Sequence, residues 1–219
     1  MWSDNLLKLL LVDDHDLVRN GIRRILDDVE GFDVVGEAQT GEEAVKMCRK
    51  SPPDIVLMDM SMPGIGGLEA TKQVLRICPD VKVIALSVHK ENPFPAKVMQ
   101  MGAFGYLTKE AAPQEMIRAI QKVAVGQKYI APEIAQQIAL AQLDSKEDDP
   151  LAQLSERELQ IMLMLTKGVK VPEIASQLNI STKTVNTYRY RMFEKLNVES
   201  DVELTHLALR HNLINPQQL

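Results

Sequence analysis

The chain has 219 residues, which is long for one compact domain and comfortable for two, because domains typically have about 100 to 150 residues. Its hydrophobic fraction of 45% and charged fraction of 25% are average for globular proteins, which excludes the disordered, fibrous and membrane classes. Cys48 and Cys78 have neither the CxxC nor the Cys/His spacing of a zinc site or a disulfide framework, so we expect free thiols in a reducing cytoplasm.

The net charge of −5 is distributed unevenly along the chain. Residues 150–219 hold eight Lys and Arg against seven Asp and Glu, so residues 1–149 carry −6. The basic excess gathers in the window 181–195, whose charged residues are Lys183, Arg189, Arg191, Glu194 and Lys195. Such a window can face phosphates, although a solvated helix face is the commoner explanation for a run of charges.

Apolar runs of strand length recur through the first part of the chain. The segments between them have the apolar spacing of helices, and the runs themselves lie at 8–12, 34–38, 54–58, 81–87 and 105–107. Near-continuous apolar strands separated by amphipathic helices indicate a parallel sheet covered on both faces, since parallel strands need helical crossovers. We predict an α/β domain over residues 6–126, with a doubly wound five-stranded parallel sheet of order 2-1-3-4-5.

The rest of the chain is predicted to be helical. Residues 127–149 are interpreted as a partly helical linker, because 144–149 contain only polar and charged side chains. Residues 150–215 have the pattern of an all-α domain with four short helices, whose start signals are Ser155, Pro172, Ser181 and Asp201.

Acidic residues follow two strands of the predicted sheet. Asp13 and Asp14 come directly after the first strand, and Asp59 comes after the third. In a sheet of order 2-1-3-4-5 these strand ends are neighbours at the topological switch point, where such folds bind ligands. Three converging carboxylates repel one another unless a divalent cation neutralises them, and oxygen ligands favour Mg²⁺. A single acidic residue at a strand end is usually only solvated, but three that converge favour a metal.

Two further polar residues are predicted to face the same crevice, since Ser87 ends the fourth strand and Lys109 follows the fifth. Each of these features is weak alone, but their order and their placement at strand ends are specific. Together they resemble the receiver domain of two-component systems over roughly residues 6 to 126, on the motifs Val12-Asp13-Asp14-His15, Leu57-Met58-Asp59-Met60-Ser61-Met62-Pro63-Gly64, Ser87 and Tyr106-Leu107-Thr108-Lys109.

The resemblance implies a phosphorylation site with its metal. Asp59 would accept a phosphoryl group from a phosphohistidine of a sensor histidine kinase. Asp14 and Asp59 would bind Mg²⁺ directly together with the backbone carbonyl of Ser61, while Asp13 would act through water.

The resemblance also implies a switch. Lys109 would pair with the transferred phosphoryl group, and Ser87 would donate a hydrogen bond to it. Tyr106 would then turn from an exposed to a buried position, and such contacts can shift a population because they differ between two states. Without Ser87 and Lys109 we would interpret Tyr106 as an ordinary half-buried strand aromatic.

The second domain has the pattern of a helix-turn-helix, because residues 173–181 read as a helix, a tight turn and a new N-cap. The sequences at 184–191, 154–158 and 194–198 resemble the LuxR/NarL/FixJ-type output domain, and the likeness extends over residues 151–215. It implies that the helix after the turn enters the DNA major groove. Base edges would be contacted by Asn186, Thr187 and Tyr190, and phosphates by Lys183, Thr184, Arg189 and Arg191.

The final helical segment carries an apolar stripe formed by Val202, Leu204, Leu207 and Ala208. This stripe resembles the dimerisation helix of the same family, and a two-fold dimer would set the spacing of two DNA half-sites.

Over its full length the chain resembles the GacA/UvrY/SirA branch of LuxR-type response regulators, notably at 11–19 and 155–164. The resemblance implies a bacterial, cytoplasmic transcription regulator that binds specific sequences of double-stranded DNA and is phosphorylated by a sensor kinase of the hybrid type. Phosphorylation is expected to favour a homodimer and to free the recognition helix from contact with the receiver domain. We expect neither membrane attachment nor enzymatic turnover.

Two other classes of function stay open on the sequence. A phosphatase with an aspartate nucleophile and Mg²⁺ needs the pattern Asp-x-Asp, but Ser61 occupies the position of the second acid. A phosphorelay or docking module would need only the receiver, which leaves residues 150–219 without a purpose.

Overall fold

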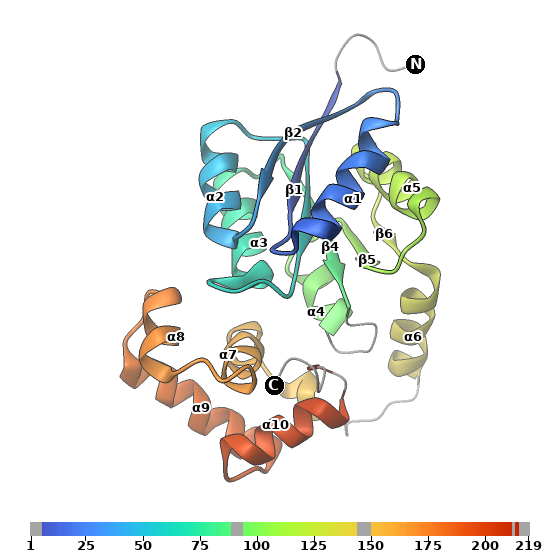
Figure 1. Cartoon of the computed structure of the whole chain (residues 1–219). Coiled ribbons are helices and arrows are strands. Elements are labelled where there is room, and N and C mark those ends of the chain that lie inside the picture. Colours follow the sequence, from blue (N-terminus) through green and yellow to red (C-terminus); the bar gives the residue numbers. More distant parts are fainter. Residues whose placement is uncertain (1–5, 89–93, 144–149, 212, 215–219) are drawn as a thin grey trace. The chain divides into compact units, whose positions relative to one another are not determined.

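The computed structural model describes residues 6–88, 94–143, 150–211 and 213–214, which form two compact units (Figure 1). The first unit is built around a β-sheet and the second contains only helices. Within the described part of the chain, no helix has both the length and the apolar character that crossing a membrane requires. The acidic stretch 144–149 of the predicted linker lies outside the described residues.

The first unit contains a parallel sheet whose strands lie in the order β2-β1-β3-β4-β5-β6. The strand bounds are β1 Leu7–Val12, β2 Phe32–Ala38, β3 Ile55–Asp59, β4 Lys82–Ser87, β5 Gly105–Thr108 and β6 Tyr129–Ile130. The predicted order 2-1-3-4-5 is confirmed. Every residue of β3 is buried, which explains why this central strand reads as a continuous apolar run and not as an alternating one.

The sheet is one strand wider than the five strands predicted from the sequence. β6 pairs in parallel with β5, where the N–H of Tyr129 donates to the carbonyl oxygen of Phe104 at 2.9 Å and the N–H of Ala131 to that of Tyr106 at 3.2 Å. The Tyr129 side chain packs into the hydrophobic core. Two residues are too few to show a strand period, so the sequence pattern places this segment in the linker.

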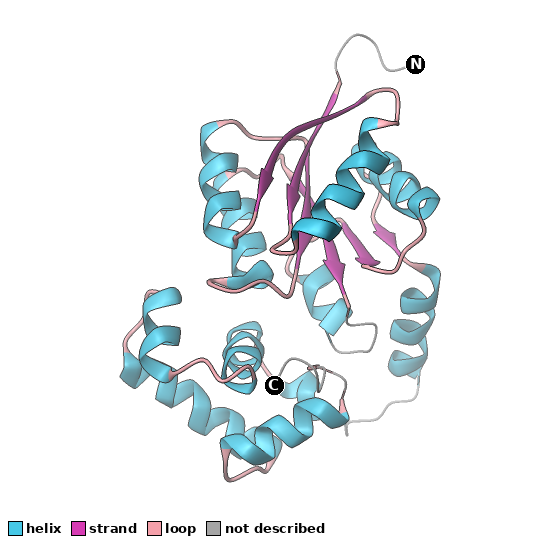
Figure 2. Ribbon diagram, in the orientation of Figure 1, coloured by secondary structure: helices cyan, strands magenta, loops and turns pink. Residues whose placement is uncertain are grey.

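Helices cover both faces of this sheet, as Figures 1 and 2 show. On one face α1 and α5 pack against alternate residues of the strands, with Leu26 and Ile120 fully buried among them. On the other face α2 and α3 pack against each other and against the sheet. The helix bounds are α1 Asp16–Asp27, α2 Gly41–Lys50, α3 Gly66–Ile77, α4 Phe94–Gln100, α5 Pro113–Ala124 and α6 Pro132–Leu143.

The second unit confirms the four predicted short helices, which follow a 3₁₀ turn at Pro150–Gln153. Their bounds are α7 Glu156–Thr166, α8 Val171–Gln177, α9 Thr182–Leu196 and α10 Asp201–Arg210. Their buried side chains meet in a small core formed by Leu159, Met162, Ile174, Val185, Met192, Leu196 and Leu204.

The tight turn between α8 and α9 depends on a residue in the left-handed region. Asn179 has φ +52°, a conformation that asparagine tolerates better than most residues. This turn lets the N–H of Ile180 donate to the carbonyl oxygen of Ala175 at 3.0 Å, so a carbonyl in the last turn of α8 gains a hydrogen-bond partner. The hydroxyl of Ser181 then accepts the N–H of Thr184 at 3.0 Å and starts α9.

The start of α7 is fixed by a capping box to which α9 contributes. The hydroxyl of Ser155 accepts the N–H of Glu158 at 3.3 Å, and the Glu158 carboxylate accepts the N–H of Ser155 at 2.7 Å. Lys195 of α9 places its Nζ 2.7 Å from the same buried carboxylate. Burial raises the pKa of Glu158, but Lys195 and Ser155 outweigh this effect, so the pKa of Glu158 lies below its usual value.

We expect Glu158→Gln to lower the free energy of unfolding of the second unit by about 1 to 3 kcal/mol near neutral pH, because glutamine cannot form the ion pair. The pKa of Glu158 is lower in the folded than in the unfolded state, so its contribution is complete above the unfolded value and is lost as the pH falls through the folded value. Urea denaturation followed by the amide NMR signals of α7 and α9 should show a difference between the two proteins that shrinks in acid. An equal difference at neutral and acid pH would contradict this account, and Glu194→Gln, on an exposed site of α9, serves as control.

Candidate functional site

The carboxyl ends of neighbouring strands bring the predicted polar residues together. β1 pairs with β3 so that Val12 lies opposite Met58, and β4 lies on the other side of β3. Asp13 follows β1, Asp59 ends β3 and Ser87 ends β4, so the three lie at one edge of the sheet. All three are buried.

Lys109 joins the two buried carboxylates. Its Nζ lies 2.7 Å from Oδ2 of Asp13 and 2.7 Å from Oδ2 of Asp59. Burial raises the pKa of the Asp59 carboxyl to about 6, and the charge of Asp13 adds to the rise, while Lys109 and the N–H of Ser61 oppose it. Burial alone lowers the pKa of Lys109, but the two carboxylates outweigh that effect and hold its pKa above the usual value.

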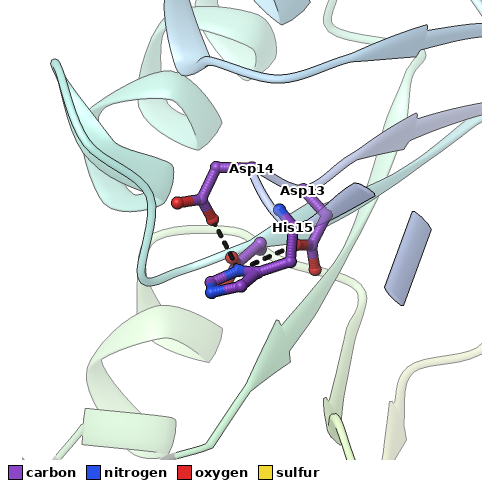
Figure 3. Close-up of side chains that lie close together, drawn as sticks. Asp13, Asp14 and His15 are labelled. Carbon is purple, nitrogen blue, oxygen red and sulfur yellow. Dashed lines mark hydrogen bonds and ion pairs between the residues drawn. The ribbon is translucent and has the colours of Figure 1, made fainter. Parts of the chain in front are cut away.

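Asp14 and His15 form the more exposed rim of this cluster (Figure 3). The Nδ1 atom of His15 lies 3.0 Å from Oδ1 of Asp14 and 3.4 Å from Oδ1 of Asp13. The backbone N–H of His15 donates to Oδ1 of Asp13 at 2.8 Å, which fixes the orientation of that carboxylate. The predicted acid pair and Asp59 therefore do converge.

This donor set fits a divalent cation. One ligand atom from each of Asp13, Asp14, His15 and Asp59 lies within 4.8 Å of the others. Oδ1 of Asp14 is buried, and among the described residues only the His15 ring lies beside it, while Oδ2 of Asp13 is paired with the Lys109 ammonium that a cation would replace. Carboxylate oxygens in this situation are ligands for a hard cation, so the acidic pocket can hold a metal.

The loop after β3 is held close against Asp59. The N–H of Ser61 donates to Oδ1 of Asp59 at 2.8 Å. Helix α3 begins so near to the end of β3 that a Cβ added to Gly67 would lie 2.0 Å from the carbonyl oxygen of Asp59. Gly67 is not among the residues predicted from the sequence, and the pair of glycines at 66–67 before an amphipathic helix is the signal that points to it.

Arg19 holds the loop that carries the acid pair, and it too is not among the residues predicted from the sequence. This buried guanidinium donates through Nη1 to the carbonyl oxygen of Asp13 at 2.7 Å and through Nε to Glu37 at 2.9 Å. Asp16 accepts from its Nη2 at 2.5 Å. The spacing of Asp16 and Arg19 on α1 indicates a local pair, but the two longer-range partners depend on how β1 and β2 are placed.

Ser87 and Tyr106 lie beside each other on the neighbouring strands β4 and β5. Tyr106 is fully buried and forms a side-chain hydrogen bond with Ser87. Burial raises the pKa of the Tyr106 hydroxyl, and the hydrogen bond opposes the rise. Of the exposed and the buried position predicted for Tyr106, the structure therefore shows the buried one.

In the second unit, α9 presents most of the residues predicted to contact DNA on its outer side. Its inner side is formed by Val185, Met192 and Leu196, and Tyr188 beside them is partly buried. The Tyr190 side chain is 64% exposed and contacts Phe193 edge to face. The exposed candidates are Lys183, Thr187, Tyr190 and Arg191, and the partly buried ones are Thr184, Asn186 and Arg189.

Arg189 differs from the other candidates because it already has an anionic partner within the domain. Its Nε and Nη2 atoms lie 2.7 Å and 2.6 Å from the two carboxylate oxygens of Asp201, the first residue of α10. Its guanidinium also lies over the ring of Phe193, 5.2 Å from the centroid. The sequence pattern of α9, which places Arg189 on the outer side of the helix, does not reveal the contact with Asp201.

The predicted dimerisation stripe on α10 contributes mainly to the domain's own core. Leu204, Leu207 and Ala208 are buried, whereas Val202 is 65% exposed. Since α10 packs on α7, an apolar stripe on this helix is explained by packing inside the domain. Only Val202 of the four is available to a second copy of the chain.

Two family models match most of the chain. The family model described as response regulator receiver domain matches residues 9–121, and the one described as bacterial regulatory proteins, luxR family, matches residues 152–208. The chain belongs to the LuxR-type response regulators of two-component systems, which makes it a DNA-binding transcription factor regulated by phosphorylation.

Two curated relatives resemble nearly the whole chain. It is 65% identical over 215 residues to the response regulator UvrY of Escherichia coli (strain K12), covering 98% of this chain and 99% of that protein. It is 54% identical over 211 residues to the response regulator GacA of Pseudomonas aeruginosa, covering 96% and 99%.

Among solved structures, RcsB from Salmonella enterica serovar Typhimurium, bound to promoter rprA in the presence of the phosphomimetic BeF3-, is similar with a TM-score of 0.72. It is 25% identical, and the match covers 92% of this chain and 98% of that one. The resemblance therefore extends over both units of the chain.

Proposed function

We propose that Asp59 is the residue that accepts the phosphoryl group. The observation that carries this proposal is a buried carboxylate at the end of β3 whose Oδ2 atom is paired with Lys109 at 2.7 Å. A carboxylate oxygen of Asp59 attacks the phosphorus of a phosphohistidine, the P–N bond breaks, and the imidazole of the sensor kinase leaves with the electron pair. Lys109 neutralises the new phosphoryl oxygens, and Ser87 donates a hydrogen bond to one of them.

The metal of this site is proposed to be Mg²⁺. Asp14, Asp59 and the backbone carbonyl of Ser61 would bind it directly, and Asp13 would bind it through water. Bound there, Mg²⁺ supplies charge neutralisation at the phosphoryl oxygens. The all-oxygen character of these ligands and the convergence of the carboxylates of Asp13, Asp14 and Asp59 support this assignment.

The experiment that tests the phosphorylation site is intact-mass analysis of the full chain after incubation with Mg²⁺ and a small acyl phosphate. We expect the wild type to gain one phosphoryl group and Asp59→Asn to gain none. Asp54→Asn, which changes an exposed acid at the other end of β3, should gain the group as the wild type does. Chelation of Mg²⁺ should prevent the gain in every protein, and phosphorylation of Asp59→Asn at the wild-type level would refute the assignment.

The outer side of α9 is proposed as the surface that reads double-stranded DNA. Exposure of Tyr190 and the position of Asn186 and Thr187 near the start of the helix support contacts to base edges. Lys183 and Arg191 are exposed cations, and Thr184 lies at the helix N-terminus, so these residues would contact phosphates. The RcsB structure bound to promoter DNA supports this use of the second unit.

We further propose that the phosphoryl donor is a sensor kinase of the hybrid type, that the phosphorylated chain is a homodimer, and that it acts in the cytoplasm without turning over a substrate. The similarity to UvrY and GacA supports these assignments. The domain boundaries proposed are 6–126 for the receiver and 150–215 for the output domain, with β6 adding residues 129–130 to the receiver sheet.

A further inference from the structure

Arg189 and Asp201 form an ion pair between α9 and α10 of the second unit. The guanidinium of Arg189 meets the carboxylate of Asp201 with two parallel contacts, at 2.7 Å and 2.6 Å. Such bidentate pairing has a fixed geometry and is stronger than a single contact between the same charges. The face of the guanidinium is covered by Phe193 at 5.2 Å, so Arg189 is held on two sides.

The position of Asp201 suits this contact. Asp201 is the first residue of α10, where the helix dipole favours a negative charge, and Ser200 caps the same helix end by accepting the N–H of Glu203 at 3.2 Å. Only residues 197–200 connect α9 to α10, and Asn197 turns the chain with φ +51°. The pair therefore crosses a short connection and sets the direction in which α10 leaves α9.

A DNA phosphate would compete poorly for Arg189. It would have to displace a carboxylate that already satisfies two guanidinium donors, and the pair presents no net positive charge. Lys183 and Arg191 are exposed on the same helix and have no ion-pair partner among the residues that the structure describes. These two cations are suited to phosphates in a way that Arg189 is not.

We infer that Arg189 is a positioning residue for DNA recognition and not a phosphate ligand: with Asp201 it fixes α9 on α10, and so sets how the outer side of α9 meets the major groove. The inference rests on the proposed use of α9 as the recognition helix. It assigns Asp201, a residue on a different helix and of the wrong charge for DNA, to the same role.

A double-mutant cycle on DNA affinity tests the inference, using the full chain and a duplex selected by the wild type from a random-sequence pool. Arg189→Gln and Asp201→Asn should each lower the affinity about ten-fold, and the double variant should be no weaker than either single variant within about two-fold. Affinity for a scrambled duplex should stay unchanged, because a positioning role affects specific contacts. Measurements are made where thermal unfolding shows every variant to be folded, so that a change in stability alone does not alter the affinity.

The dependence of affinity on salt distinguishes the two roles of an arginine. Loss of a phosphate ligand reduces the slope of log K against log salt by about 0.9, and Lys183→Gln should show this change. Arg189→Gln should leave the slope at the wild-type value. A reduced slope for Arg189→Gln, or tighter binding by Asp201→Asn because a cation has been released, would overturn the inference. If Lys183→Gln changes neither affinity nor slope, α9 is not the DNA interface, and the proposed function of this helix fails with the inference that rests on it.

Discussion

A Gly67→Ala variant is expected to lose about 3 kcal/mol or more of the unfolding free energy of the first unit, and to lose phosphorylation with it. The added methyl carbon would lie 2.0 Å from the carbonyl oxygen of Asp59 and 2.6 Å from Cα of Met60. Both are backbone atoms, so neither can rotate away as the end of a flexible side chain does. Helix α3 would have to move off the end of β3, and the carboxylate of Asp59 would move with its backbone.

Urea denaturation followed by the amide signals of β3 and α3 measures the loss, and intact-mass analysis with an acyl phosphate measures phosphorylation. Gly66→Ala, one residue earlier, places its methyl in open space but at φ +70°, and should cost only about 1 to 2 kcal/mol. Gly21→Ala, on an exposed site inside α1 with nothing within 4 Å, should instead gain about 0.5 to 1 kcal/mol. A Gly67→Ala protein as stable as the wild type would show that α3 can shift without cost.

The acidic cluster could be predicted from sequence because it depends on a regularity of the fold. Parallel strands end at the same edge of their sheet, so residues directly after β1 and β3 become neighbours whatever the helices between them contain. Asp13, Asp59 and Lys109 indeed converge within ion-pair distance. The helix-turn-helix was equally accessible, since N-cap signals such as Ser181 act within a few residues.

Features that depend on distant partners escaped the same reasoning. Arg19 reads as one more charge on α1, and only the pairing of β1 with β2 brings Glu37 within its reach. Arg189 reads as an outward cation on α9, because Asp201 becomes its partner only through the turn at Asn197. A residue pattern reports which side of an element a side chain lies on, but not what the rest of the chain places beside it.

The apolar stripe of α10 shows the same limit for a surface. Periodicity indicates that Leu204 and Leu207 share a face of the helix, and both the domain core and a dimer interface require such a face. The structure places both residues in the core and leaves Val202 exposed. A dimer that uses α10 must therefore be formed by exposed side chains of this helix, such as Val202, and not by its core face.

Lys109→Met is expected to weaken folding in the absence of metal and to strengthen metal binding. Removing the ammonium leaves two buried carboxylates, Asp13 and Asp59, without their shared counter-charge, which should lower the unfolding free energy of the first unit by about 3 kcal/mol. The same loss frees both Oδ2 atoms for a cation, so we expect Mg²⁺ to bind at least about ten-fold more tightly than in the wild type.

Urea denaturation with and without Mg²⁺, together with calorimetric titration of the metal, measures both effects. Because a ligand that binds only the folded state stabilises it, Mg²⁺ should restore most of the stability that Lys109→Met loses, and should stabilise the wild type less. Lys46→Met, on an exposed site of α2, should change both quantities little. A variant that is destabilised but binds Mg²⁺ no better than the wild type would separate Lys109 from the metal site. The lysine would then support the fold there without competing with the cation.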